Sequence, residues 1–237
     1  MSSNETIRAI GIIIEDFLPY RGLKLDESQD LNPDNINTKL TNYHFYRITA
    51  QRIEPRGHRK WVFIYVLSND SSKTTQTPAK NKPKLVDLLN SADTDPKYKD
   101  LDELIIIAPQ SFFGKKPLLD TMEMISNEKG IKTYDPTGEK PYYNAYPYNI
   151  FVLNLPEHVE VPRHEIVPMD GVVNFMRFER LSKMDSLPKI LSSDPPVVWL
   201  GARDGQIVKI YRPSETTLET IVYRRVFSIA RSMPISS

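Results

Sequence analysis

Residues 186–226 read SLPKILSSDPPVVWLGARDGQIVKIYRPSETTLETIVYRRV, and they largely decide the fold of the C-terminal part of the chain. Asp194 precedes a proline at what would be the first position of a helix, and Gly201 stands where that short helix would end. The segments 207–212 and 220–225 are rich in β-branched and aromatic residues, and a short polar segment separates them. The sequence therefore predicts a short helix followed by a β-hairpin.

The segment before this stretch marks the start of a second domain. Prolines recur through residues 156–168, which predicts extended backbone because proline lacks a backbone donor and breaks helices. Asp170 can cap the helix predicted over residues 171–181, whose apolar residues share one face. We therefore expect a small α+β domain over residues 156–237.

The first part of the chain alternates helical and strand-like patterns. Apolar residues recur at helical spacing over residues 6–25 and predict a helix. Residues 45–53 and 61–67 are typical of two strands, and residues 54–60 of the hairpin loop between them. The polar segments 26–42 and 68–82 are expected to be loops.

Two further apolar segments, 104–108 (LIIIA) and 150–155 (IFVLNL), predict buried strands. A helical pattern precedes each of them, one opening at Pro83 and the other at Pro117. Helix–strand–helix–strand order is typical of a crossover unit in a sheet covered by helices. The fold class we expect is α/β (α+β), with a mixed sheet and flanking helices in a first domain over residues 1–155.

Composition excludes several classes of protein. Lys and Arg number 31 and Asp and Glu 30, whereas most free-standing nucleic-acid binders are clearly basic. Cysteine is absent, so neither disulfides nor thiolate metal sites are available. No run approaches the roughly 18 apolar residues of a membrane-spanning helix, and we expect no membrane contact.

Catalytic and metal-binding patterns are weak. His158 and His164 lie among glutamates, but Pro162 between them rules out a helical ligand pair. Asp102 and Glu103 precede a predicted strand, as nuclease carboxylates do, but no following strand has an acid–x–lysine pattern. Phosphate-binding glycine loops and nucleophile elbows are also absent. We expect no catalytic residue, no bound metal and no cofactor.

Two basic clusters could contact nucleic acid. One is the predicted hairpin tip, with Arg52, Arg56, His58, Arg59 and Lys60. The other is Lys115-Lys116-Pro117 at a predicted helix start, where free amide donors favour phosphate. From the sequence alone, solvated turns without a ligand are the favoured interpretation of both clusters.

The second domain resembles the assembly domain of the fifth subunit of multisubunit DNA-directed RNA polymerases, which has a counterpart in archaea. The similarity extends over roughly 70 residues in one order, which makes it far more specific than a short motif. The matching positions are His158, Val161, Pro162, His164, Leu187, Pro188, Ile190, Asp194, Pro195, Gly201, Gly205, Val208, Lys209, Ile210, Arg212, Ser214, Glu215, Thr216, Tyr223 and Arg224.

The first domain is similar to the jaw domain of the longer, eukaryotic type of this subunit. The stretches DELIIIA, GKKPLLD and YPYNIFVLNLP look closest to the versions that large DNA viruses encode. The resemblance implies a nuclease-like fold without catalytic residues. It also implies a non-catalytic subunit that docks on the largest polymerase subunit, contacts other polymerase subunits and lies beside downstream duplex DNA, with Lys115, Lys116 and Pro117 near it.

The polymerase's magnesium site would then belong to other subunits. If the protein is viral, we expect it in viral factories of the host cytoplasm and in the virion; if cellular, in the nucleus. A free-standing nucleic-acid-binding module and a nuclease-fold protein stay open as alternatives. Salt-dependent DNA affinity of the isolated chain would favour the first, and magnesium-dependent cleavage the second.

Overall fold

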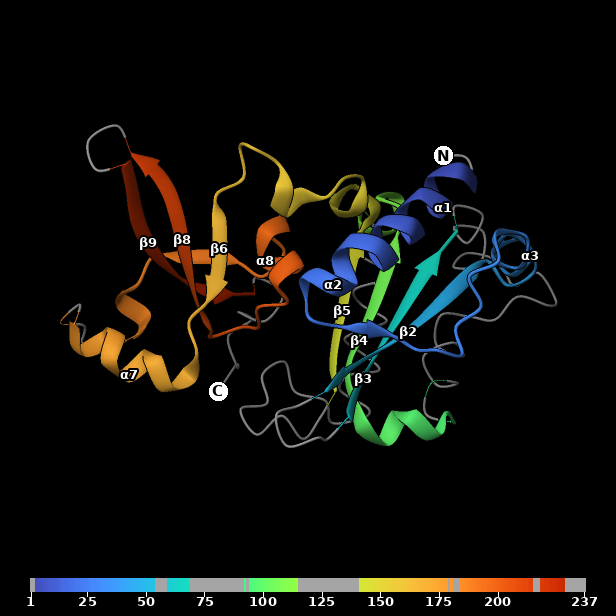
Figure 1. The fold of residues 1–237 in the computed structure, drawn as a ribbon, viewed down its shortest axis with the longest axis horizontal. Helices are drawn as coiled ribbons and strands as arrows, with labels where there is room; N and C mark the ends of the chain where they lie inside the picture. The colour runs from blue at the N-terminus through green and yellow to red at the C-terminus, as the bar shows by residue number, and fades with distance from the viewer. Residues whose placement is uncertain are drawn as a thin grey trace. The chain divides into compact units, whose positions relative to one another are not determined.

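The structure is a computed structural model that describes residues 3–53, 59–68, 92, 94–114, 141–178, 180, 184–214 and 218–228. The chain divides into two compact units, Met1–Leu153 and Asn154–Ser237. Each unit has its own sheet and its own helices, and both sheets mix parallel and antiparallel pairs (Figure 1). The mixed α/β, α+β class predicted from the sequence is confirmed.

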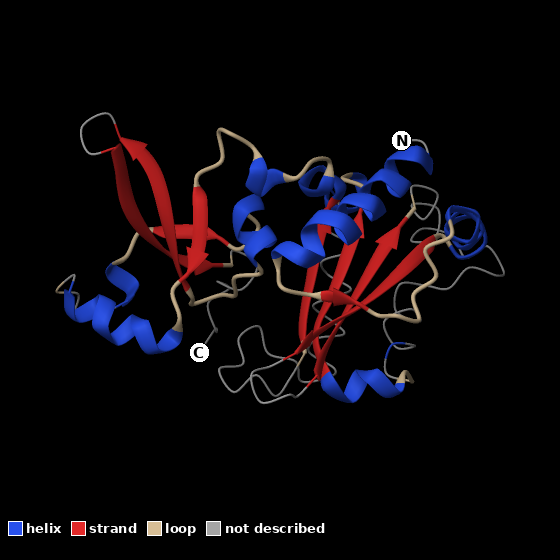
Figure 2. Cartoon of the chain, viewed as in Figure 1, coloured by secondary structure: helices blue, strands red, loops and turns tan. Residues whose placement is uncertain are grey.

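The sheet of the first unit has five strands in the order β1-β2-β3-β4-β5. The first three, β1 (Lys24–Leu25), β2 (Phe45–Ile53) and β3 (Arg59–Leu67), pair antiparallel. Next to β3, β4 (Leu101–Ala108) and β5 (Tyr142–Pro147) run parallel, as Figure 2 shows in red. The predicted hairpin and the predicted strand at 104–108 are therefore confirmed.

The N-terminal helical segment covers one face of this sheet (Figure 1). The chain begins with α1 (Ser3–Ile12), a π-helical turn (Ile13–Phe17) and α2 (Leu18–Tyr20). The predicted helix over 6–25 is thus wrong after Tyr20, because Gly22 adopts a positive φ of 66° and the next residues pair with β2 as β1.

The sequence predicts a loop for the polar segment 26–42, and that prediction is wrong in its second half. The segment contains most of α3 (Pro33–Tyr43). Asn32 caps this helix by accepting a hydrogen bond from the Asp34 N–H at 3.0 Å. Ile36 and Leu40, one turn apart, are buried, so the helix has an apolar stripe although most of its residues are polar.

The predicted strand at 150–155 is also wrong. Tyr148–Phe151 is a 3₁₀ turn, and the strand is β5, within the tyrosine-rich segment before it. Val152 and Leu153 are 45% and 43% exposed, so the apolar run is not a buried strand. Instead, the aromatic residues of β5 fit the pleat of the sheet.

The core of the first unit lies on both faces of the sheet. On the helix-covered face, Phe17 meets Phe151 edge-on, with ring centroids 5.1 Å apart. The opposite face packs Phe63, Tyr65, Leu104 and Ile106 with residues of α5 (Ser111–Gly114). Pro96–Asp100 forms a 3₁₀ turn before β4. The helices predicted from Pro83 and Pro117 lie outside the described residues, as does the segment 69–82.

The second unit has a four-stranded sheet in the order β6-β8-β9-β7. The strands are β6 (Arg163–Ile166), β7 (Lys189–Leu191), β8 (Ile207–Ser214) and β9 (Leu218–Phe227). The antiparallel β8–β9 hairpin predicted from the sequence is confirmed, and β7 runs parallel to β9.

Helices pack on opposite faces of this sheet. Residues of α7 (Met169–Phe178), the 3₁₀ turn Met184–Ser186 and Ile207 form one apolar cluster, and residues of α8 (Pro195–Leu200) form another with Val208 and Val226. As predicted from its prolines, the segment 156–168 contains no α-helix and is extended over β6; a 3₁₀ turn (Leu155–Glu157) and a second turn closed by the Val161 N–H and the His158 carbonyl precede that strand. In the described part of the chain, every helix is too short or too polar to cross a membrane.

Candidate assembly surface of the second unit

The α8 turn is built by the Asp194, Pro195 and Gly201 positions. Asp194 occupies the N-cap with extended backbone, and its carbonyl accepts the Val198 N–H at 2.9 Å, but its carboxylate makes no capping hydrogen bond. Pro195 begins the helix, and Gly201 ends it in the left-handed conformation, with φ at 69°. The predicted bounds of this helix are therefore confirmed.

Two titratable groups meet at this turn, the buried His164 and the half-buried Asp194. His164 on β6 is 8% exposed, and its Nδ1 donates to the Pro162 carbonyl at 2.5 Å. Burial lowers the pKa of His164, because desolvation disfavours the imidazolium. Burial likewise raises the pKa of the Asp194 carboxyl, with the nearby His164 and Arg224 acting against it. His164 is therefore a buried, hydrogen-bonded residue whose burial favours the neutral imidazole.

Several further positions of the resemblance are structural. Gly205 has φ at 85°, and its N–H donates to the Val226 carbonyl at 2.9 Å, which fixes the start of the hairpin. Ile190, Val208 and Ile210 belong to the apolar cluster under α8. The sequence order that carries the resemblance thus largely encodes the core and the turns of this unit.

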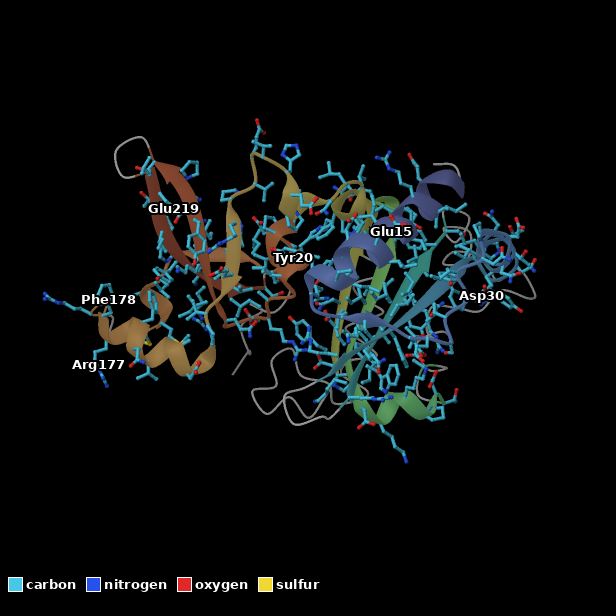
Figure 3. The ribbon with its side chains drawn as sticks, in the orientation of Figure 1. Glu15, Tyr20, Asp30, Arg177, Phe178 and Glu219 are labelled. Carbon is cyan, nitrogen blue, oxygen red and sulfur yellow. The ribbon has the colours of Figure 1, made fainter. Side chains whose placement is uncertain are left out.

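The opposite face is only partly covered. Phe175 of α7 stacks on Tyr223 of β9, with ring centroids 4.2 Å apart, and Leu187 joins this contact. At the outer end of α7, Phe178 is 84% exposed and points away from the sheet (Figure 3). Val173 on the same helix is 61% exposed. The helix therefore buries one stripe and leaves apolar side chains in solvent.

A polar cluster that the sequence did not predict lies on β6 and β8. The Arg163 guanidinium lies 4.1 Å from the centroid of the Tyr211 ring, and the Lys209 ammonium lies 4.4 Å from it. The Tyr211 hydroxyl donates to Glu165 at 2.6 Å, and Glu165 pairs with Arg163 at 3.0 Å. Charged residues alternating with apolar ones on neighbouring strands are the sequence signal that could have predicted it.

The remaining predicted positions are dispersed. His158 is exposed at the end of a 3₁₀ turn, where its carbonyl accepts the Val161 N–H at 2.9 Å. Arg212 and Ser214 lie on the distal half of β8, and Arg224 lies on β9. Outside the described residues lie Glu215 and Thr216, the predicted DNA contact Lys115, Lys116 and Pro117, and Arg56 and His58 of the hairpin tip.

In the first unit, the residues considered for a nuclease site are engaged with cations. Glu103 pairs with Arg21 at 3.1 Å, with both side chains almost fully buried, and it accepts a hydrogen bond from Asn144 at 2.8 Å. Asp102 lies 3.7 Å from Arg52. Over the described residues, no three His, Asp or Glu side chains gather as a metal site would require.

Comparison with known proteins identifies one family in viruses, archaea and eukaryotes. A family model described as RNA polymerase Rpb5, C-terminal domain, matches residues 153–226. The chain is 31% identical over 217 residues to a DNA-directed RNA polymerase RPB5 homolog of African swine fever virus, covering 90% of this chain and 93% of the viral protein.

Cellular relatives match over a shorter stretch. The Rpo5 subunit of Methanococcus vannielii is 42% identical over 76 residues, which are 32% of this chain and 96% of the archaeal protein. The RPABC1 subunit of Caenorhabditis briggsae is 39% identical over 75 residues, which are 35% of its own length. The viral match spans nearly the whole of both proteins, and on this ground the chain belongs to the RPB5 family of DNA-directed RNA polymerase subunits.

Proposed function

We propose that the chain is a non-catalytic subunit of a viral DNA-directed RNA polymerase. Its second unit docks on the largest subunit, and its first unit forms part of the jaw around downstream DNA. The observation that carries this proposal is the extent of the viral match. Its 217 residues exceed the length of either unit, so both units share the likeness.

Exposed apolar side chains of the second unit support a docking role. Tyr223 and Leu187 are held against α7, whereas Phe178 and Ile221 expose 84% and 43% of their surface. Exposed apolar side chains beside charged ones are typical of a surface that a partner covers. A face of this kind fits a subunit that assembles with larger ones.

The chemistry of the first unit supports the absence of catalysis. A metal-dependent nuclease needs carboxylates free to bind a divalent ion. Glu103 instead neutralises Arg21 in the core, and its other oxygen is held by Asn144. The nuclease-like fold of this unit and its place beside DNA are proposed from the resemblance to the jaw domain.

The division of labour can be tested by binding. Tagged fragments 154–237 and 1–153 are each mixed with the purified largest subunit, and the full chain serves as the control. Retention of fragment 154–237 at near the level of the full chain, and loss of fragment 1–153, is expected. Retention of the first fragment alone would reverse the assignment.

The non-catalytic proposal has its own assay. Purified full-length chain is incubated with duplex and single-stranded DNA and with magnesium or manganese, and no cleavage is expected. Cleavage that disappears in an Asp102→Ala, Glu103→Ala double variant would establish the nuclease alternative. We further propose that the protein acts in the cytoplasm of an infected host and is packaged in the virion.

A further inference from the structure

Strand β9 is longer than β7, its neighbour on one side. It pairs with β8 on the other side from Leu218 to Arg225. On the β7 side, pairing is limited to Arg225, Val226 and Phe227. In the described part of the chain, no strand lies beside residues 221–224 on that side.

The backbone groups along this edge can be assigned from their neighbours. Val226 exchanges hydrogen bonds with Gln206 and Gly205 on the β8 side. Arg225 donates to the Pro188 carbonyl at 2.9 Å on the β7 side. Because the direction of backbone groups alternates along an antiparallel strand, Ile221 and Tyr223 direct their N–H and C=O groups to the β7 side, beyond the end of β7.

The side chains of this edge do not protect it. Natural edge strands avoid unwanted pairing by lysines, prolines or bulges. Residues 221–223 read IVY, and Ile221 is 43% exposed. An apolar, regular edge with outward amide groups is the surface to which an extended peptide adds as another strand.

Charge indicates the chemistry of the added strand. Strands β7, β8 and β9 carry the cations Lys189, Lys209, Arg212, Arg224 and Arg225 but a single carboxylate, Glu219, near the hairpin tip (Figure 3). Next to the edge, the Arg224 Nη1 donates to the Lys189 carbonyl at 3.5 Å, and its buried Nε has no hydrogen-bond partner among the described residues. Within the unit, the half-buried Asp194 interacts electrostatically with Arg224, and an acidic side chain on the incoming strand would pair with the donors of this guanidinium that remain.

We propose that residues 221–224 of β9 receive an extended, acidic segment of the largest polymerase subunit, which adds to the sheet as a strand in line with β7. This inference rests on the proposed function, since it names how the second unit docks. The strand supplies main-chain hydrogen bonds to Ile221 and Tyr223 and a carboxylate to Arg224.

Hydrogen exchange at single amides tests the proposal on the full-length chain. In the isolated chain, the amides of Ile221 and Tyr223 should exchange rapidly, whereas the amide of Val222, directed at β8, should be protected. In the complex with the largest subunit, all three should be protected. A complex in which Ile221 and Tyr223 still exchange rapidly would overturn strand addition and leave the proposed function intact; failure to form any complex would count against the function itself.

Protection of the Ile221 and Tyr223 amides in the isolated chain would also overturn the proposal. Protection at all protein concentrations would mean that the chain covers its own edge. Protection at high protein concentration only would mean that a second copy of the chain covers it.

A matched pair of variants separates the backbone contribution from that of the side chain. Ile221→Pro removes the outward amide and should weaken binding to the largest subunit roughly tenfold, whereas Ile221→Thr keeps the amide and should bind within about threefold of wild type. Equal losses in both variants would refute main-chain pairing, and retained Val222 protection in Ile221→Pro would verify that the hairpin is folded.

Discussion

The buried Arg21–Glu103 pair should be the most sensitive electrostatic contact of the first unit. Glu103→Gln keeps the shape of the side chain and an oxygen for Asn144, but it removes the negative charge. Arg21 would then remain charged and buried, with side-chain exposure of only 2%. It would still contact the Phe17 ring, whose centroid lies 5.0 Å from the guanidinium carbon.

The size of the effect follows from the geometry. At 3.1 Å and an effective dielectric constant of about 20, two unit charges attract each other by about 5 kcal/mol. Removing one partner of a buried pair typically costs about 3–5 kcal/mol of stability. We expect the free energy of unfolding of the first unit to fall by about 3–5 kcal/mol. The double variant Arg21→Met, Glu103→Leu should recover most of it, because an apolar pair removes the uncompensated charge.

The two tryptophans allow each unit to be followed separately. Trp61 lies on β3 of the first unit, and Trp199 is buried in α8 of the second. Urea unfolding of Glu103→Gln is monitored in Trp199→Phe and Trp61→Phe backgrounds. The Trp61 transition should move to lower urea, and the Trp199 transition should stay in place. A loss below about 1 kcal/mol in the first unit, or an equal shift in both, would refute the reasoning.

Three further outcomes are expected. Gly205→Val should lower the unfolding free energy of the second unit by roughly 1–3 kcal/mol, because φ at 85° strains a β-branched residue; thermal unfolding by circular dichroism measures it. Burial lowers the pKa of His164 in the folded state below 6.5, so the unfolded state binds the proton more readily. The second unit should therefore be fully stable above pH 6.5 and lose stability as the pH falls below it. Urea unfolding across pH measures this dependence of stability on pH, which should be weaker in His164→Gln. Replacing Lys115 and Lys116 with glutamate should leave assembly intact but reduce the salt tolerance of elongation complexes, because each phosphate contact adds about 0.9 to the slope of log affinity against log salt. If the variant transcribes like wild type across a salt titration, these lysines do not make the proposed DNA contact.

Local chemistry made much of the fold predictable. The β2, β3 and β4 strands are rich in β-branched and aromatic residues, and this local composition alone indicates them. Proline after Asp194 and glycine at 201 set the bounds of α8, because each residue suits one end of a helix. These signals act within a few residues of one another.

The elements that were predicted wrongly depend on distant contacts. β1 exists because it pairs with β2, and β5 because it pairs with β4. Most residues of α3 are polar, and its two buried apolar residues gain their role only from packing against the rest of the unit. Pairing partners far along the chain leave little trace in local periodicity.

The candidate site was predictable to a different degree. Resemblance selected core and turn positions such as Gly205 and Val208, because their chemistry is fixed by the fold. The Arg163–Tyr211 contact and the open edge of β9 were missed, since they arise from strand order and strand length. Surface features of this kind require the sheet topology.

The central claim is that the chain is an assembled polymerase subunit, and native mass spectrometry tests it most directly. The chain is tagged at its natural locus, the complex is purified from infected cells under physiological salt, and the intact mass and its subunits are measured. We expect one copy of the chain in a complex that contains the largest polymerase subunit and elongates RNA. Recovery of the chain alone, while the active polymerase is purified without it, would contradict this claim.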